Sequence, residues 1–280
     1  MFEPILSDNS GKVSQCNTYR GLRTGESSKA YAARLAKELD EAFSRFPAGT
    51  VCAFVAETVT GASTGSVPPA EGYFAAVKEV CEKHGALLIL DEVMCGMGRT
   101  GTMHAWQQEN VVPNIQVIGK GLEQAMYLSQ AHPSACAAAL EVQNIIHEED
   151  LLANVRAMGS RLASSLQAKI GSHPNVGDIR GRGLFWSVEF VDDKVTRETF
   201  PPEWNVGYSV HELAMQEPYN LCVYPGKGTV DGISGDHVLI SPPYNVTPAE
   251  IDTIVERLAA VLSDFFREKN GMGRVDARQW

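Results

Sequence analysis

Two side chains of opposite charge follow two short predicted strands. Asp91 comes directly after the apolar run 87–90 (LLIL), and Lys120 closely follows residues 115–118 (IQVI). Short apolar segments bounded by turn residues are typical of buried strands in a parallel sheet. Open α/β sheets bind their ligands at the carboxyl ends of the strands. The sequence therefore predicts a carboxylate and an amine at one edge of one sheet.

The neighbours of Lys120 favour one kind of chemistry. Glycines stand on both sides of it, at positions 119 and 121, so the amine can approach a bound aldehyde closely and form an imine. A carboxylate such as that of Asp91 can keep a pyridine nitrogen protonated, which makes the ring an electron sink. Taken alone, such a lysine is more often a surface residue in a turn, and such an aspartate is often a helix cap.

Three segments in a fixed order resemble the class III aminotransferases, which bind pyridoxal phosphate (PLP) in the fold-type I architecture. They are residues 91–93 (DEV), 96–101 (GMGRTG) and 119–121 (GKG). The resemblance implies that Lys120 holds PLP as an imine and then acts as the general base of the proton shift. It also implies that Asp91 pairs with the pyridine nitrogen and that Val93 lies against the ring. An ordinary core valine is the alternative interpretation of Val93.

A further acid, Glu57, ends the short apolar segment that begins at residue 51. Residues 56–59 (AETV) are similar to the family's AEPV segment, which places an acid near the substrate, with Thr58 in place of the proline. We therefore expect Glu57 to border the substrate pocket, and a surface acid is the alternative. Leu239 stands where many family members carry an arginine, so a bidentate grip on a substrate carboxylate is lost there.

The elements that must position these residues follow from periodicity. Residues 26–46 carry an apolar stripe at four-residue steps, which predicts a helix. Residues 51–90 form a strand, a helix that ends at Gly85 and a second strand, which is a βαβ unit of a parallel sheet. Further helices are predicted from Pro133 to Ile146, from Asp150 to about Gly171 and over 248–267, and further strands over 183–191, 221–224 and 238–241.

These elements predict an α/β fold of the fold-type I PLP-transferase kind. An incomplete large domain with a mostly parallel sheet is expected over residues 1–147. A smaller C-terminal α+β domain is expected over residues 148–280, with a loose tail from about residue 270.

Composition narrows the classes of function. The chain has 280 residues, 44% of them apolar and 21% charged, with a net charge of −10, so nucleic-acid and membrane partners are not expected. No apolar run is long enough to cross a bilayer, and the first residues do not begin a signal peptide. The six cysteines form no CxxC pair and the seven histidines show no metal-ligand spacing. We expect a cytoplasmic protein with reduced thiols and without a metal site.

The resemblance implies amino transfer from an amine or amino acid to a 2-oxo acid, by a ping-pong route in a homodimer. It covers residues 2 to about 268 but only the later part of a family member. The family's phosphate-binding glycine-serine turn has no counterpart, and Leu128 falls where a threonine reaches the cofactor phosphate of the partner. Losing three or four such contacts would cost about 5–10 kcal/mol. The alternative is therefore a truncated, catalytically impaired relative that acts as a non-enzymatic or heterodimeric partner, or else an incomplete gene model.

Overall fold

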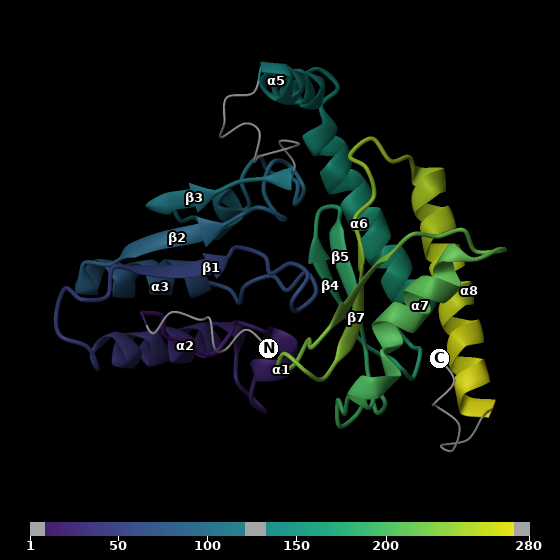
Figure 1. Ribbon diagram of the computed structural model, residues 1–280, viewed down its shortest axis with the longest axis horizontal. Coiled ribbons are helices and arrows are strands. Elements are labelled where there is room, and N and C mark those ends of the chain that lie inside the picture. Colours follow the sequence, from purple (N-terminus) through teal and green to yellow (C-terminus); the bar gives the residue numbers. More distant parts are fainter. Residues whose placement is uncertain (1–8, 121–132, 272–280) are drawn as a thin grey trace.

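The computed structural model describes residues 9–120 and 133–271 of the chain. These residues form two lobes, each with its own sheet and helices (Figure 1). The first lobe contains a three-stranded sheet and the second a four-stranded sheet. Leu128 and the expected tail beyond residue 271 lie outside the described residues. Within the described part, no helix combines the length and the apolar character that a membrane span requires.

The sheet of the first lobe is parallel, as predicted. Its strands are β1 (Ala53–Glu57), β2 (Leu87–Asp91) and β3 (Ile115–Val117), in the spatial order β1-β2-β3. Glu57 is the register partner of Asp91, and Asp91 is the partner of Val117. All three strands therefore end level with one another, at a single edge of the sheet.

Helices cover one face of this sheet. They are α2 (Ser28–Phe43) and α3 (Tyr73–His84), and the short α1 (Thr18–Gly21) and the 3₁₀ helix η2 (Ala105–Glu109) lie nearby. The predicted stripe of α2 is buried together with Phe74 and Val77 of α3 and with Leu88 and Leu90 of β2. Gly85 ends α3 with a φ of 68°, a left-handed conformation that glycine adopts without steric cost.

The opposite face of the sheet is apolar and largely exposed. Side chains of a strand alternate between the two faces, so Val55, Leu87 and Ile115 point away from α2 and α3. Val55 is 62% exposed and Ile115 is 45% exposed. Glu57 and Asp91 share this alternation and lie on the same open face, at its carboxyl edge.

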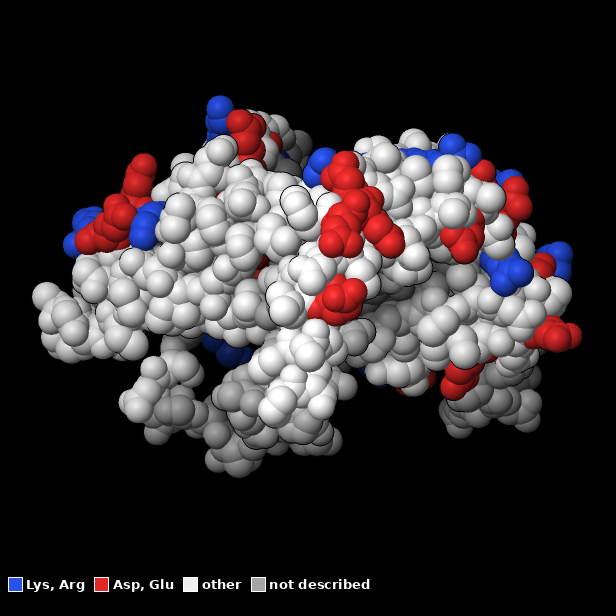
Figure 2. Space-filling model, turned by 90° about the horizontal axis from the view of Figure 1, so that it is seen from above, with Lys and Arg blue, Asp and Glu red and all other residues white. Residues whose placement is uncertain are grey.

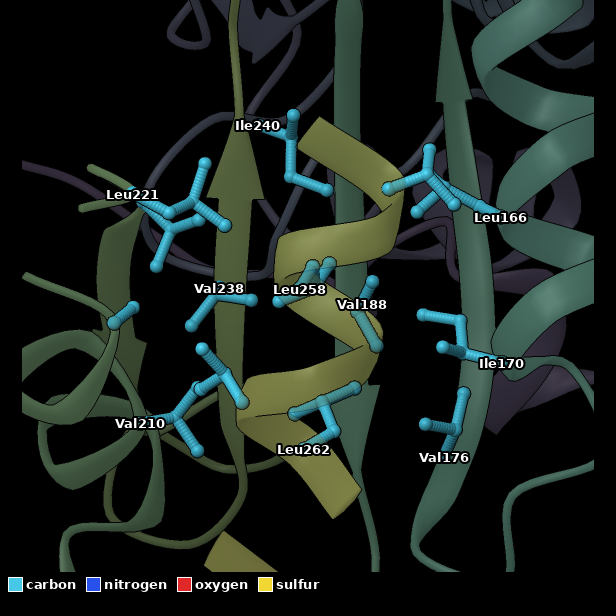
Figure 3. Packing of buried hydrophobic residues seen from close by; sticks show 14 of the residues in the cluster. Leu166, Ile170, Val176, Val188, Val210, Leu221, Val238, Ile240, Leu258 and Leu262 are labelled. Carbon is cyan, nitrogen blue, oxygen red and sulfur yellow. The ribbon is translucent and has the colours of Figure 1, made fainter. Parts of the chain in front are cut away.

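The second lobe has an antiparallel sheet in the order β4-β5-β7-β6. Its strands are β4 (Val176–Arg182), β5 (Phe185–Phe190), β6 (Tyr224–Lys227) and β7 (Asp236–Ile240). Its helices are α6 (Leu151–Ile170), η4 (Pro202–Trp204), α7 (Val206–Met215) and α8 (Pro248–Gly271), and the preceding helix α5 (Pro133–Glu148) packs against α6. Figure 3 shows the core, in which Val188 and Val238 of the sheet meet Leu258 and Leu262 of α8.

The second lobe differs from the prediction in three places. The strand predicted over 183–191 is confirmed as β5, but it is the second arm of a hairpin whose first arm, β4, was not predicted; Gly183 reverses the chain between the two arms with a φ of 54°. The strand predicted over 221–224 begins only at Tyr224, although Leu221 and Val223 are buried as expected of strand residues. The helix α7 was not predicted.

A buried ion network joins the two lobes. Glu189 of β5 is fully buried and accepts hydrogen bonds from Arg20 (Nε, 2.8 Å) and from Arg180 (Nη1, 2.5 Å). Arg180 also donates to the carbonyl oxygens of Thr64 (2.5 Å) and Gly65 (2.7 Å) in the first lobe. Charged side chains buried with this many partners fix one relative placement of the surfaces that they join.

Candidate active site

The predicted site residues follow the three strands at one edge of the parallel sheet. Glu57 is the last residue of β1 and Asp91 the last of β2, and the two are register partners. Lys120 follows three positions after Val117, which ends β3. Parallel strands bring their carboxyl ends to one side, which is where α/β sheets hold ligands. The structure thus gathers Glu57, Asp91 and Lys120 at one edge.

A local turn holds the carboxylate of Asp91. Its Oδ1 accepts a hydrogen bond from the backbone N–H of Val93 at 2.9 Å, an arrangement that aspartate forms readily with the residue two positions later. Asp91 and Val93 are both half-buried. One carboxylate oxygen is therefore fixed by the chain itself, and Val93 belongs to the same turn, two positions further on.

Glu57 interacts electrostatically with both of the other residues. Its Oε1 accepts a hydrogen bond from the backbone N–H of Gly61 at 3.1 Å. Burial raises the pKa of Glu57, and the hydrogen bond from Gly61 lowers it. The charge of Asp91 raises this pKa further, whereas the charge of Lys120 lowers it. A cation bound between the two carboxylates would relieve their repulsion.

Lys120 is the residue of this group that is most open to solvent. Its side chain is exposed, while the preceding Gly119 is buried. The backbone φ of Lys120 is 30°, a positive value that is uncommon for any residue except glycine. Such a backbone is more frequent at functional sites than elsewhere. The amine is thus accessible to a molecule that binds at the sheet edge.

Glu92 supports the carboxyl edge of the parallel sheet, a role that we did not predict from the sequence. It is fully buried and its two carboxylate oxygens accept four hydrogen bonds. The donors are Thr58 Oγ1 (2.8 Å), Trp106 N (2.7 Å), Ala105 N (2.8 Å) and Gln116 Nε2 (2.9 Å). These donors follow β1, open η2 and belong to β3, so this one carboxylate joins the segments around all three strand ends.

The glycine-arginine segment 96–101 connects the edge to the second lobe. Arg99 Nη1 donates to the carbonyl oxygens of Pro242 (2.6 Å) and Leu184 (3.3 Å). Its guanidinium lies 4.5 Å from the centre of the Tyr244 ring, within the range of a cation–π interaction. Thr100 donates to the carbonyl oxygen of Cys95 at 3.2 Å. These contacts give Arg99 and Thr100 a structural role at the junction of the two lobes.

Leu239 lies in the small core between the lobes. It is buried among Val59, Cys95 and Phe185, so an apolar side chain replaces any cation at this position. The expected loss of a bidentate grip on a substrate carboxylate at this position follows from the residue type itself.

Comparisons with known proteins identify the family. The family described as Aminotransferase class-III matches residues 15–132 and 129–262. An aminotransferase of Gibberella zeae is 46% identical over 285 residues, which cover 92% of this chain and 56% of that protein. An uncharacterized aminotransferase of Schizosaccharomyces pombe is 45% identical over 288 residues, covering 94% of this chain and 62% of that protein. The chain thus spans less than two thirds of the length of these relatives.

Solved structures agree with this result. An omega transaminase from Pseudomonas jessenii, determined in complex with PMP, superposes with a TM-score of 0.79 at 32% identity. The superposition covers 91% of this chain and 60% of the transaminase. The predicted fold-type I organisation, with a parallel sheet followed by an antiparallel one, is confirmed. The chain belongs to the class III aminotransferases.

Proposed function

We propose that this chain takes part in PLP-dependent amino transfer from an amine or amino acid to a 2-oxo acid, and that the sheet edge is its active site. The observation that supports this most is the level register of Glu57 and Asp91, with Lys120 beyond the third strand. Among the relatives, a gamma aminobutyrate transaminase of Solanum lycopersicum is 33% identical over 86% of this chain. Its name agrees with amino donors whose amino group is distant from the carboxylate.

The residues at the edge fit two of the three polar parts of PLP. The ring nitrogen needs an anion beside it, and Asp91 offers a half-buried carboxylate that Val93 N–H holds in place. The aldehyde needs an amine, and Lys120 offers an exposed one. The position that the family uses for phosphate, Leu128 here, lies outside the described residues. The fit therefore rests on the ring and the aldehyde.

Each residue has a defined task in this proposal. PLP, when bound, supplies an aldehyde that takes up the amino group and a ring that accepts electrons. Asp91 accepts a hydrogen bond from the ring nitrogen and so keeps a proton there. Lys120 Nζ removes the proton from the carbon that carries the amino group, and returns a proton to that carbon of the 2-oxo acid in the second half of the reaction. Val93 supports one face of the ring and excludes water from it.

Glu57 would set the polarity of the substrate pocket. It lies on the same open face as Asp91, and burial already raises its pKa. A substrate ammonium group placed beside Glu57 would gain from its charge, whereas a substrate carboxylate there would be repelled. With Leu239 in place of a cation, we propose an amine, or an amino acid with a distant carboxylate, as the donor.

Three further expectations remain proposals. We propose a homodimer, as the class implies, and a division between the two domains at residues 147 and 148, which falls at the end of α5. We propose a cytoplasmic location, because all six cysteines are free thiols and reduced thiols are typical of that compartment.

A titration of the purified chain with PLP tests the proposal. The wild type should develop the visible absorbance band of a lysine imine, and the Lys120→Ala variant should not. Lys37→Ala is the matched control, because Lys37 is an exposed lysine of α2 with only a surface ion pair to Glu41. It should bind PLP as the wild type does. Added amine and 2-oxo acid should then exchange their amino group only where the band forms.

Two results would count against this function. A band of equal intensity in Lys120→Ala would show that another lysine binds the aldehyde. Binding of PLP through Lys120 without any exchange between amines and oxo acids would favour the alternative, a catalytically impaired partner protein.

A further inference from the structure

A hollow between the two lobes lies apart from the sheet edge. It has a volume of about 540 Å³ and its walls come from two segments. Residues 20–26, which begin in the last turn of α1 and pack on the first lobe through Leu22, form one wall. Residues 195–197 of the second lobe form the other. The volume is within the range of about 300–1,000 Å³ that is common for small-molecule sites.

The walls of the hollow are tied to each other. Arg20 Nη1 donates to the carbonyl oxygen of Arg197 at 2.5 Å. The guanidinium of Arg197 in turn lies 4.8 Å from the ring centre of Tyr19 in α1 and donates to the Tyr19 carbonyl oxygen. Arg197 has a φ of 62°, a conformation rare for a residue other than glycine. The backbone that presents its side chain is thus held by contacts from the other lobe.

The charges of the lining are unbalanced. Arg20 is paired with Glu189. Glu26 is paired with Arg34 (Nε to Oε1, 2.7 Å), whose hydrogen bond is the largest of the causes that lower the pKa of Glu26 to about 2. Within residues 9–120 and 133–271, no ion pair forms at Arg23 or Arg197. Two arginines, one from each lobe, therefore line the hollow without an ion pair: Arg23 feels the charge of Glu26, and Arg197 donates to the carbonyl oxygen of Tyr19.

The surroundings favour an anion over other ligands. The nearby carboxylate of Asp193 accepts hydrogen bonds from the N–H groups of Val195 and Thr196, both at 2.7 Å, so it is directed at its own loop. The hydroxyl-bearing residues Thr24 and Thr196 line the hollow beside the arginines. Over the whole chain acids exceed bases, with a net charge of −10, and on the face seen in Figure 2 red side chains gather near the middle.

We propose that this hollow binds a small molecule with a dianionic oxyanion group, held between Arg23 of the first lobe and Arg197 of the second. The planar fork of a guanidinium donates two parallel hydrogen bonds to a phosphate or a carboxylate. Because the two arginines belong to different lobes, the bound anion bridges them and stabilises their relative placement. A phosphoryl group and a dicarboxylate share this chemistry, and the experiment separates them.

Isothermal titration calorimetry with inorganic phosphate, and separately with succinate, tests the site at constant ionic strength. Sodium chloride is the control for charge screening. The wild type should show saturable binding of at least one anion, and its thermal unfolding midpoint should rise with that anion. Arg23→Gln should weaken binding by about fivefold, the size expected for one exposed charge contact. The structure describes no side-chain hydrogen bond of Arg23, so this variant should fold normally.

Two matched variants complete the design. Arg161→Gln removes an exposed arginine of α6 that is paired with Asp252 of α8, and should bind as the wild type does. Lys120→Ala should also leave binding unchanged, which separates this site from the proposed active site. Arg197→Gln should weaken binding like Arg23→Gln. The proposal is overturned if neither anion binds saturably, or if Arg23→Gln and Arg161→Gln bind equally well.

Discussion

The two sheets of this protein differ in how they are covered. In the antiparallel sheet of the second lobe every residue of β7 is buried, and α6 and α8 pack against the core around it (Figure 3). In the parallel sheet of the first lobe, the core with α2 and α3 occupies one face, and the other exposes Val55 and Ile115. Glu57 and Asp91, which belong to the proposed active site, lie on that exposed face.

The residues that stabilise the fold and the residues that we propose to bind a ligand therefore lie on different sheets. Side chains that fill the second core contribute through burial and close packing, where each lost contact counts. Side chains on the open face of the parallel sheet contribute little to stability through burial, so their types can be set by the ligand that binds there. We therefore expect substitutions in the second core to change the free energy of unfolding, and substitutions on the open face to change mainly what binds there.

The largest expected effect comes from the second core. Leu258→Ala should lower the free energy of unfolding by about 4 kcal/mol, because it removes a fully buried side chain and leaves a cavity. Urea unfolding followed by circular dichroism gives this value. A loss below about 1 kcal/mol would show that the second core is not the stable part of the molecule.

The next effect tests whether the sheet edge has a rigid support. Glu92→Gln replaces one acceptor oxygen by an amide group, which leaves two of the four donors around it unpaired. We expect a loss of about 3 kcal/mol in unfolding free energy. Asp91→Asn, at the adjacent and more exposed position, should cost much less. Equal losses in the two variants would contradict the support that we assign to Glu92.

A pH effect should come from the contact between the lobes. Burial, with the charge of Arg180 as a second cause, lowers the pKa of His237 from its usual 6.5 to about 4. The unfolded chain therefore takes up the proton at a higher pH than the folded chain does. The stability that this buried neutral imidazole contributes is present above pH 6.5 and is lost as the pH falls towards 4, by on the order of 2–3 kcal/mol.

Unfolding free energies measured between pH 7 and pH 4 test this linkage. The His237→Gln variant should lose less stability over that interval than the wild type. Identical pH profiles would mean that His237 does not titrate as its surroundings imply.

The smallest effect is expected on the open face of the parallel sheet. Val55→Thr keeps a β-branched side chain that suits a strand, and Val55 is 62% exposed. The unfolding free energy should therefore change by less than about 0.5 kcal/mol. A loss as large as that of Leu258→Ala would erase the contrast between the two sheets.

Local patterns in the sequence were sufficient to predict much of this arrangement. The stripe of α2, the end of α3 at Gly85 and the placement of Asp91 at a strand end all follow from residues close in the chain. The role of Glu92 could not be predicted, because its donors come from three separate segments. The junction of Arg180 with the carbonyl oxygens of Thr64 and Gly65 is likewise formed by contacts between distant residues. Strand β4 was not predicted, because glycines and charged residues interrupt its apolar positions.

Peptide mapping of the protein after incubation with PLP and reduction with borohydride tests the central claim most directly. If Asp91 and Lys120 form one site at the sheet edge, mass spectrometry should find the pyridoxyl group on the peptide that contains Lys120, and Asp91→Ala should reduce that labelling strongly. Labelling spread over exposed lysines such as Lys37, or unchanged in Asp91→Ala, would contradict the claim.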